Sequence, residues 1–172
     1  EFAYMVIVYT SNTGFTREYA EMLSRVNHMK LCELSQAKRQ LDRGSPVFYL
    51  GPLMAGRITG LKEARKLFDV KGVLGVGMSP PCQEMLQILH QSNETGGAPI
   101  FYAQGGWDPS RLSWTKRKMT DMATRSIRRA LQDKGPNRTP LEQQQLDFLR
   151  YGGTYVSFQN LSAVQEWLKG VL

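Results

Sequence analysis

The stretch "MVIVYTSNTGFTREYAEML", Met5–Leu23, places an apolar run, a small polar loop and a helical pattern in direct succession. Met5–Tyr9 is rich in β-branched and aromatic residues, which favours a strand. Arg17–Val26 carries apolar residues three or four positions apart, which predicts a helix. The Ser, Thr, Asn and Gly residues between them favour tight turns and helix caps. The stretch therefore predicts a strand–loop–helix unit.

The same alternation continues along the chain, although only a short polar stretch follows the second strand. Further strands are predicted at Lys30–Leu34, Pro46–Gly51, Gly72–Gly77, Pro99–Ala103 and Tyr155–Phe158, and further helices at Thr59–Phe68, Gln83–Gln91 and Ser162–Val171. Most of these strands are continuous apolar runs, which is typical of strands buried on both faces of a parallel sheet. Five such strands with helices between them predict a doubly wound α/β fold.

The segment Gly106–Gly153 is too long for a single crossover between strands. Its pattern predicts a helix over roughly Ser113–Gln132, a Gly-Pro-Asn break and a shorter helix from about Pro140 to Tyr151. A chain of 172 residues fits one domain with one substantial core. We therefore expect residues 1–172 to form a single domain in which residues 106–153 are a basic helical elaboration.

The loop after the first strand of a doubly wound sheet is the usual phosphate site. Gly14 permits a tight turn, and we expect backbone N–H groups from Thr13 to Thr16 to point into the concavity. The hydroxyls of Ser11, Thr13 and Thr16 would add donors beside the positive end of the helix dipole. Other phosphate motifs do not fit, because the chain has no GxxxxGK[ST] and "GVGMSP" lacks the third glycine of a dinucleotide motif. The alternative is that the polar residues only cap the helix.

The stretch "IVYTSNTGFTREYAEML" resembles the flavodoxin signature, with Tyr9, Ser11, Gly14, Thr16 and Ala20 at positions typical of that family. The resemblance implies a flavodoxin-like, five-stranded parallel sheet with the strand order 2-1-3-4-5. It also implies flavin mononucleotide (FMN) as the cofactor. The residues expected to hold its phosphate are Ser11, Asn12, Thr13, Gly14, Phe15 and Thr16, with Phe15 where many flavodoxins have Asn.

Two further loops are expected to contact the flavin ring. "GPLMAGRITGL", Gly51–Leu61, stands where flavodoxins place an apolar or aromatic residue on the inner flavin face. "GVGMSPPC", Gly75–Cys82, is similar to the family's loop over the outer face but lacks its usual stacking Tyr. The alternative is that each loop is an ordinary strand-to-helix connection. The residues expected to bind the cofactor are Pro52, Leu53, Met54, Ala55, Gly56, Gly77, Met78, Ser79, Pro80 and Cys82.

A second, looser resemblance covers much of the C-terminal half. "YAQGGWDPSRLSWTKRKM", Tyr102–Met119, and "GGTYVSFQNLSAVQEWL", Gly152–Leu168, are similar to the flavodoxin-domain subfamily that includes menaquinone-dependent protoporphyrinogen dehydrogenases. This resemblance implies an oxidoreductase with a porphyrin and a quinone as substrates, in which the flavin carries the chemistry and no catalytic side chain is assigned. The alternatives are a flavodoxin-type electron carrier between protein partners and a flavin-free interaction module on the same fold.

The chain has a net charge of +7, and the segment Ser110–Lys134 carries +6 of it. Flavodoxins that carry electrons are typically acidic, so this charge favours the oxidoreductase. In the predicted long helix, apolar residues three and four apart define one face. The helix either lies on an anionic membrane through Arg111–Lys134, or grips the propionates of a porphyrin, or packs its apolar face on the sheet with its charges in solvent. No nucleic acid is expected, since no reading motif accompanies the charge. The predicted apolar face consists of Met119, Met122, Ala123, Ile127, Ala130 and Leu131.

Composition and motifs bear on where the protein is located and whether it binds a metal. No apolar run reaches the length of a membrane span, and no secretory leader is recognisable. Cys32 and Cys82 form neither a disulfide framework nor a zinc motif, so no metal is expected. We therefore expect a cytoplasmic protein, peripheral to the inner face of the membrane if the basic helix meets lipid. Trp107 and Trp114 flank the basic segment and are candidates for the wall of the flavin cleft.

Overall fold

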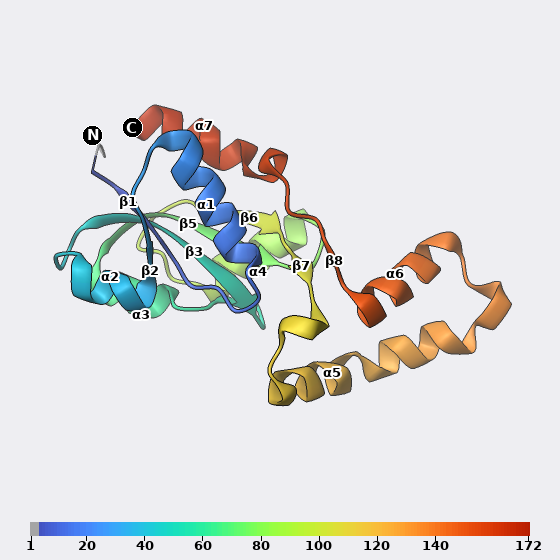
Figure 1. Cartoon of the computed structure of the whole chain (residues 1–172). Coiled ribbons are helices and arrows are strands. Elements are labelled where there is room, and N and C mark those ends of the chain that lie inside the picture. The colour runs from blue at the N-terminus through green and yellow to red at the C-terminus, as the bar shows by residue number, and fades with distance from the viewer. Residues whose placement is uncertain (1–3) are drawn as a thin grey trace. The chain divides into compact units, whose positions relative to one another are not determined.

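The computed structural model describes residues 4–172, and the chain divides into two compact units. The sheet unit comprises the chain up to Gly105 together with Tyr155–Leu172, and the helical unit comprises Gly106–Thr154. The helical unit thus covers nearly the same residues as the expected elaboration. Figure 1 shows the course of the chain through both units.

Five parallel strands form the body of the sheet, in the order β2-β1-β3-β5-β6. Counted along the chain without β4, this is the predicted order 2-1-3-4-5, so the predicted fold class is confirmed. The unpredicted strand β4 pairs antiparallel with the end of β3 and makes the sheet six-stranded. The strands are β1 Val6–Tyr9, β2 Leu31–Glu33, β3 Pro46–Met54, β4 Arg57–Ile58, β5 Asp69–Gly77 and β6 Ile100–Gln104.

Helices cover both faces of this sheet, as a doubly wound fold requires. Residues of α1 (Phe15–Asn27) and α7 (Ser162–Val171) join one apolar cluster. Residues of α2 (Leu34–Gln40), α3 (Leu61–Leu67) and α4 (Gln83–Ser92) join a second cluster. Figure 1 shows α1 and α7 side by side over the sheet.

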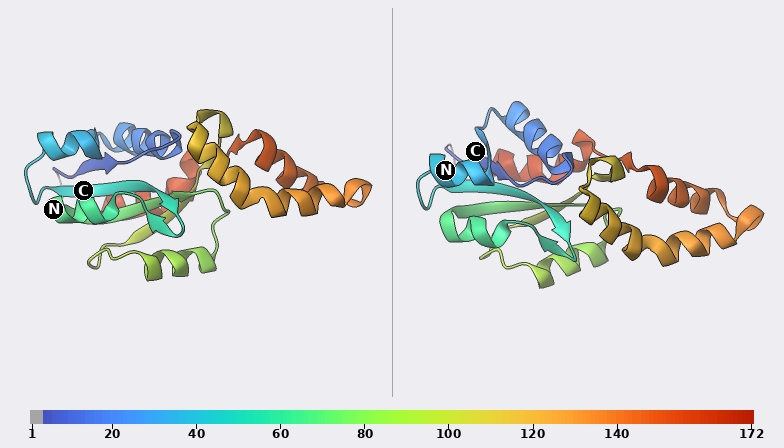
Figure 2. Two further views of the ribbon diagram at one scale, coloured as in Figure 1. Left: turned by 90° about the horizontal axis from the view of Figure 1, so that it is seen from below. Right: turned by 60° about the horizontal axis from the view of Figure 1, so that its bottom comes forward.

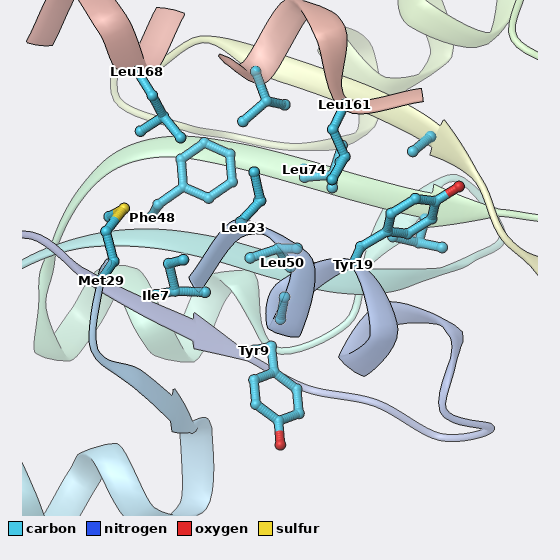
Figure 3. Packing of buried hydrophobic residues seen from close by; sticks show 14 of the residues in the cluster. Ile7, Tyr9, Tyr19, Leu23, Met29, Phe48, Leu50, Leu74, Leu161 and Leu168 are labelled. Atoms are coloured by element: carbon cyan, nitrogen blue, oxygen red, sulfur yellow. The ribbon is translucent and has the colours of Figure 1, made fainter. Parts of the chain in front are cut away.

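The two clusters follow from the alternation of side chains along each strand. Ile7 and Tyr9 of β1 belong to the first cluster, whereas Val6 and Val8 belong to the second. All four side chains are buried, which explains why the strand is a continuous apolar run. Each such burial stabilises the fold by roughly 1.5–3 kcal/mol. Figure 3 shows the first cluster, where side chains from α1, α7 and the strands meet.

The structure corrects two predictions in this unit. The polar stretch after the second strand forms α2, because Leu34 and Ala37 lie three positions apart and are both buried. The predicted strand Tyr155–Phe158 was wrong, since this segment runs as coil into the 3₁₀ helix Phe158–Leu161. Ser157 ends the extended backbone by capping that helix, with its Oγ accepting from the Gln159 N–H at 3.3 Å.

The helical unit contains two helices and a two-stranded antiparallel ribbon, and α5 and α6 form a helical hairpin in Figures 1 and 2. Ser113 caps α5 and Thr139 caps α6, each through its hydroxyl oxygen. These caps explain why the starts of both helices were predicted to within one residue. The elements are β7 Gly106–Trp107, the 3₁₀ helices Pro109–Arg111 and Gly135–Asn137, α5 Trp114–Asp133, α6 Pro140–Tyr151 and β8 Gly153–Thr154.

The predicted apolar face of the long helix is largely exposed within the helical unit. Its side chains at Met119 and Met122 are 64% and 69% exposed, and only Leu131 of α5 is buried. On the side of α5 that carries Leu131, the less exposed residues are Thr120, Thr124 and Arg128, so α5 turns a largely polar side towards the rest of the helical unit. The predicted helix is confirmed, and what its apolar face meets stays a prediction.

Candidate functional site

The carboxyl ends of the parallel strands and the loops that follow them form the candidate site. The loop after β1 turns sharply at Gly14, which has φ = 97° and stands at the N-cap of α1. This left-handed conformation suits glycine because it has no Cβ. The Gly14 N–H donates to Ser11 Oγ at 3.1 Å, and Gly14 has no side chain with which to cap the helix. A polar loop therefore closes over the positive end of the α1 dipole.

The other residues of this loop differ in exposure. Asn12 is exposed, whereas Ser11 and Thr13 are half-buried. Thr16 is the buried polar side chain among the described residues, with 2% exposure, at the second position of α1. Phe15 turns its ring into the first apolar cluster. The loop thus combines hydroxyl and amide groups at its rim with an apolar anchor below.

Tyr49 of β3 joins this loop to the next one. Its Oη lies 2.7 Å from the Thr59 carbonyl oxygen and 2.8 Å from Thr10 Oγ1. Because a carbonyl only accepts, Tyr49 donates to Thr59 and accepts from the Thr10 hydroxyl. The Thr10 N–H also donates to the Leu50 carbonyl at 3.0 Å. Two loops of the candidate site are therefore fixed by one buried hydroxyl group.

The segment after the third strand is a β-hairpin and not the loop that the sequence predicted. β3 continues to Met54, so Pro52 and Leu53 lie on a strand, and β4 pairs back onto it. Ala55 and Gly56 make the turn with φ = 51° and 81°, the signs that a type I′ turn requires. Met54 is 58% exposed at the tip and Leu53 is half-buried.

Asn93, which ends α4, clamps this hairpin. Its Oδ1 accepts from the Ile58 N–H at 2.8 Å, and its Nδ2 donates to the carbonyls of Gly56 and Leu89 at 2.9 and 3.0 Å. The side chain is half-buried, so these bonds are shielded from competing water. The sequence alone carried no signal for this role, because a lone Asn after a helix reads as an ordinary C-cap.

The loop after β5 contains the residues expected over the outer flavin face. Met78, Ser79, Pro80 and Cys82 are all exposed, and Gly77 is half-buried. The Cys82 Sγ accepts from the Met85 N–H at 3.4 Å and thereby caps α4. Each of these residues lies at the carboxyl edge of the sheet, as the parallel topology requires.

Side chains from β6 hold this loop in place. Tyr102 Oη donates to the Ser79 carbonyl at 2.5 Å, and Gln104 Nε2 donates to the Met78 carbonyl at 2.9 Å. The Gly105 N–H donates to the Gly77 carbonyl at 2.7 Å. Tyr102 and Gln104 thus act on the backbone of the loop from the neighbouring strand, a role that the sequence alone did not indicate.

The loops after β1 and β6 also meet. A Cβ on Gly105 would lie 3.2 Å from the Cβ of Phe15, so the two backbones approach closely there. Tyr19 Oη donates to the Gln104 carbonyl, and Asn160 Nδ2 donates to Tyr19 Oη at 2.8 Å. The loop after β1, the β3–β4 hairpin and the loop after β5 are thus linked by hydrogen bonds through β3 and β6.

The two tryptophans belong to the helical unit. Trp107 is buried, and its Nε1 donates to the Leu149 carbonyl at 3.3 Å. Trp114 is 74% exposed, with Lys118 Nζ 4.9 Å from the centre of its ring. His28 and His90 are exposed and take no part in the edge.

Neither a cluster of metal ligands nor a membrane-spanning helix is present among residues 4–172. That part of the chain contains no group of three or more His, Cys, Asp or Glu side chains able to hold a metal ion. Across the same residues, no helix combines the length and the apolar character needed to cross a bilayer.

Burial raises the pKa of both Tyr49 and Tyr102 to about 12. The folded protein therefore keeps these phenols protonated at a pH where unfolded chains have begun to lose the proton, near 10. Between these values the native state binds more protons, so stability should fall as the pH rises from 10 towards 12. Ultraviolet titration at 295 nm should show late-ionising tyrosines, Tyr49 and Tyr102 among them, and Tyr49→Phe should remove one from that late phase. Ionisation of all tyrosines near pH 10 in folded protein would contradict this.

Comparison with protein-family models, with curated proteins and with solved structures gives no match to this chain.

Proposed function

We propose that this protein binds FMN at the carboxyl edge of its sheet and acts as a flavodoxin-like oxidoreductase. The observation that carries the proposal is the Gly14 turn, which sets Ser11 and the loop hydroxyls at the start of a 13-residue helix. Such a helix start favours a dianionic phosphate through its dipole and its backbone N–H groups. The resemblance to the flavodoxin signature points to the same ligand.

The donor set of the loop fits a phosphate monoester. The Gly14 N–H already donates to an oxygen atom, Ser11 Oγ. A phosphate oxygen placed at that point of the loop would meet the same donor. Ser11, Asn12, Thr13 and Thr16 supply hydroxyl or amide groups, and the loop contains no carboxylate to repel an anion. Phe15 contributes only backbone, because its ring packs in the core. We assign phosphate binding to Ser11, Asn12, Thr13, Gly14, Phe15 and Thr16.

The two other loops offer a mainly apolar setting for a flavin ring. The half-buried Leu53 and the exposed Met54 come from the hairpin, and the exposed Met78 comes from the loop after β5. Apolar side chains with a few backbone polar groups are the usual lining for a flat aromatic ligand. We propose that Pro52–Gly56 contact one ring face and that Gly77–Ser79, Pro80 and Cys82 contact the other.

Bound FMN would supply two-electron chemistry, accepting a hydride from one substrate and returning it to another. The chain's own residues orient the ring and control access to it. No aromatic side chain covers the loop after β5 among residues 77–82, which leaves room for a substrate there. A porphyrin donor and a quinone acceptor are the substrates that the second resemblance suggests. We further propose a cytoplasmic protein at the inner face of the membrane, where quinones are found.

The charge of the chain favours the enzyme over a flavodoxin-type carrier, which remains the second candidate. The net charge is +7, whereas carriers use acidic surfaces to dock on basic reductases. Oxidation of a porphyrinogen with reduction of a soluble quinone by the purified flavoprotein would support the enzyme. Electron delivery to a protein acceptor without either substrate reaction would favour the carrier, and a colourless protein without FMN affinity would leave an interaction module.

Replacing Thr16 by Val should weaken FMN binding about 10- to 100-fold, since an unmet bond to a charged group costs roughly 1–3 kcal/mol. Val keeps the volume of this buried side chain and removes only its hydroxyl. The matched control is Thr115→Val on the exposed surface of α5. Fluorescence quenching of FMN gives the dissociation constants. Wild-type affinity in Thr16→Val, or no retained flavin in the folded wild-type protein, would refute the proposed site.

A further inference from the structure

The basic residues of the helical unit fall into two groups. Five of them are held by groups within the unit. Arg117 and Arg128 donate to the carbonyls of Pro109 and Asp121, both at 2.7 Å. The other three are Arg111 on Asp108, Lys134 on Glu142 and Arg138 on the Leu131 carbonyl. These side chains stabilise the helical hairpin of α5 and α6. They could bind a partner only by giving up those bonds.

A second group has no hydrogen bond or ion pair to any residue among 4–172. It includes Lys118, Arg125 and Arg129, which we call the basic strip. They stand seven and four positions apart on α5, so they lie within one narrow side of the helix. The three line a hollow of about 630 Å³ together with Asp121, Met122 and Gln132, among others. The Lys118 ammonium lies over the exposed Trp114 ring.

An apolar stripe lies beside the basic strip on the same helix. It consists of Met119, Met122, Ala123, Ile127 and Ala130, all exposed within the helical unit. Met119, Met122 and Ile127 are 64%, 69% and 46% exposed. The less exposed side of α5 carries Thr120, Thr124 and Leu131 instead.

We propose that this side of α5 docks on an anionic phospholipid surface. The basic strip would take lipid phosphates, and the apolar stripe would enter the boundary between headgroups and acyl chains, as in interfacial amphipathic helices. Exposed Trp114 at the start of the helix suits the same boundary. A nucleic acid would bind the cations and leave the methionines in water. A lipid surface accounts for both the basic strip and the apolar stripe. The inference rests on the proposed membrane placement and needs no bound FMN.

The test is sedimentation with vesicles of phosphatidylcholine alone or with 30% phosphatidylglycerol. The full chain should bind only the anionic vesicles, and less at high salt, because salt screens the attraction. Lys118→Gln, Arg125→Gln and Arg129→Gln together should lower the partition coefficient on the order of 100-fold, at about 1 kcal/mol for each cation near the surface. Met119→Gln with Met122→Gln should lower it at least tenfold while preserving charge, since roughly two apolar side chains leave the boundary.

Matched variants in the sheet unit serve as controls. Arg39→Gln, Arg43→Gln and Lys62→Gln remove the same charge from exposed sites, and Val26→Gln with Leu86→Gln removes exposed apolar side chains. Both controls should bind vesicles like wild type. The proposal is overturned if wild type does not bind anionic vesicles, if the charge variants and their control behave alike, or if the methionine variant binds fully. Retained FMN is measured on every variant, so loss of flavin and loss of lipid binding are told apart.

Discussion

Gly60→Ala should destabilise the sheet unit by about 3–4 kcal/mol, the sum of left-handed backbone strain and overpacking in a filled interior. Gly60 has φ = 82°, and a Cβ there would lie 2.1 Å from Tyr49 Oη and 2.9 Å from Thr10 Oγ1. The methyl group would therefore break the bonds that join the loop after β1 to the hairpin. Urea unfolding followed by circular dichroism gives the free energy of unfolding.

Gly44→Ala is the matched control for this substitution. Gly44 also has φ = 82°, but nothing lies within 4 Å of the position of its Cβ. Gly44→Ala should lower the free energy of unfolding only by the cost of left-handed backbone strain, about 1 kcal/mol. The difference between the two variants measures the contact with Tyr49 and Thr10. Equal losses in both variants would show that the loops are not joined at this point. Since the same contact orders the loop after β1, FMN affinity should fall in Gly60→Ala and not in Gly44→Ala.

Asn93→Ala should cost about 2–3 kcal/mol of stability, because three hydrogen bonds of about 1 kcal/mol each disappear. The Ile58 N–H and the Gly56 carbonyl would lose their partner on the side chain. We expect the hairpin to exchange its amide hydrogens faster, which hydrogen–deuterium exchange of the peptides around Leu53 and Ile58 would detect.

Two further variants make this prediction specific. Asn93→Asp keeps the acceptor for Ile58 but replaces the donor to Gly56 by a carboxylate oxygen, so it should be destabilised at least as much as Asn93→Ala. Asn137→Ala removes an exposed Asn that makes no side-chain hydrogen bond within the described chain, and it should stay within about 0.5 kcal/mol of wild type. Unchanged exchange at the hairpin in Asn93→Ala would disprove the clamp.

The sheet could be predicted because its signals are local. Each parallel strand is buried on both faces, so it appears as an apolar run, and β1 is an example with Val6–Tyr9 all buried. α2 was missed because its seven residues present only two buried apolar positions, Leu34 and Ala37. The segment Tyr155–Phe158 has strand-like residues but no neighbouring strand to pair with in the main sheet. Propensity without a partner strand does not make a sheet.

The place of the candidate site in the fold could be predicted from the sequence. The side chains that hold its loops in position could not. The polar loop around Gly14 follows from the order strand, glycine turn, helix. Tyr49 and Tyr102 act from the middle of two strands, where apolar patterning treats them as core residues. Their hydroxyl partners lie in loops distant in sequence, and only the folded topology brings them together. The partner of the apolar stripe on α5 could not be predicted either, because the spacing shows a stripe but not what covers it.

The Tyr155 N–H donates to the Gly105 carbonyl at 2.8 Å, so the chain leaves and re-enters the sheet unit at a single point. Leu161, Val164 and Leu168, which follow that point, are fully or nearly fully buried in the first cluster. During synthesis on the ribosome, the sheet therefore lacks one of its covering helices until the whole insertion has been translated. An apolar face of β3 and β5 stays uncovered meanwhile, and the nascent chain is most prone to aggregate in that interval.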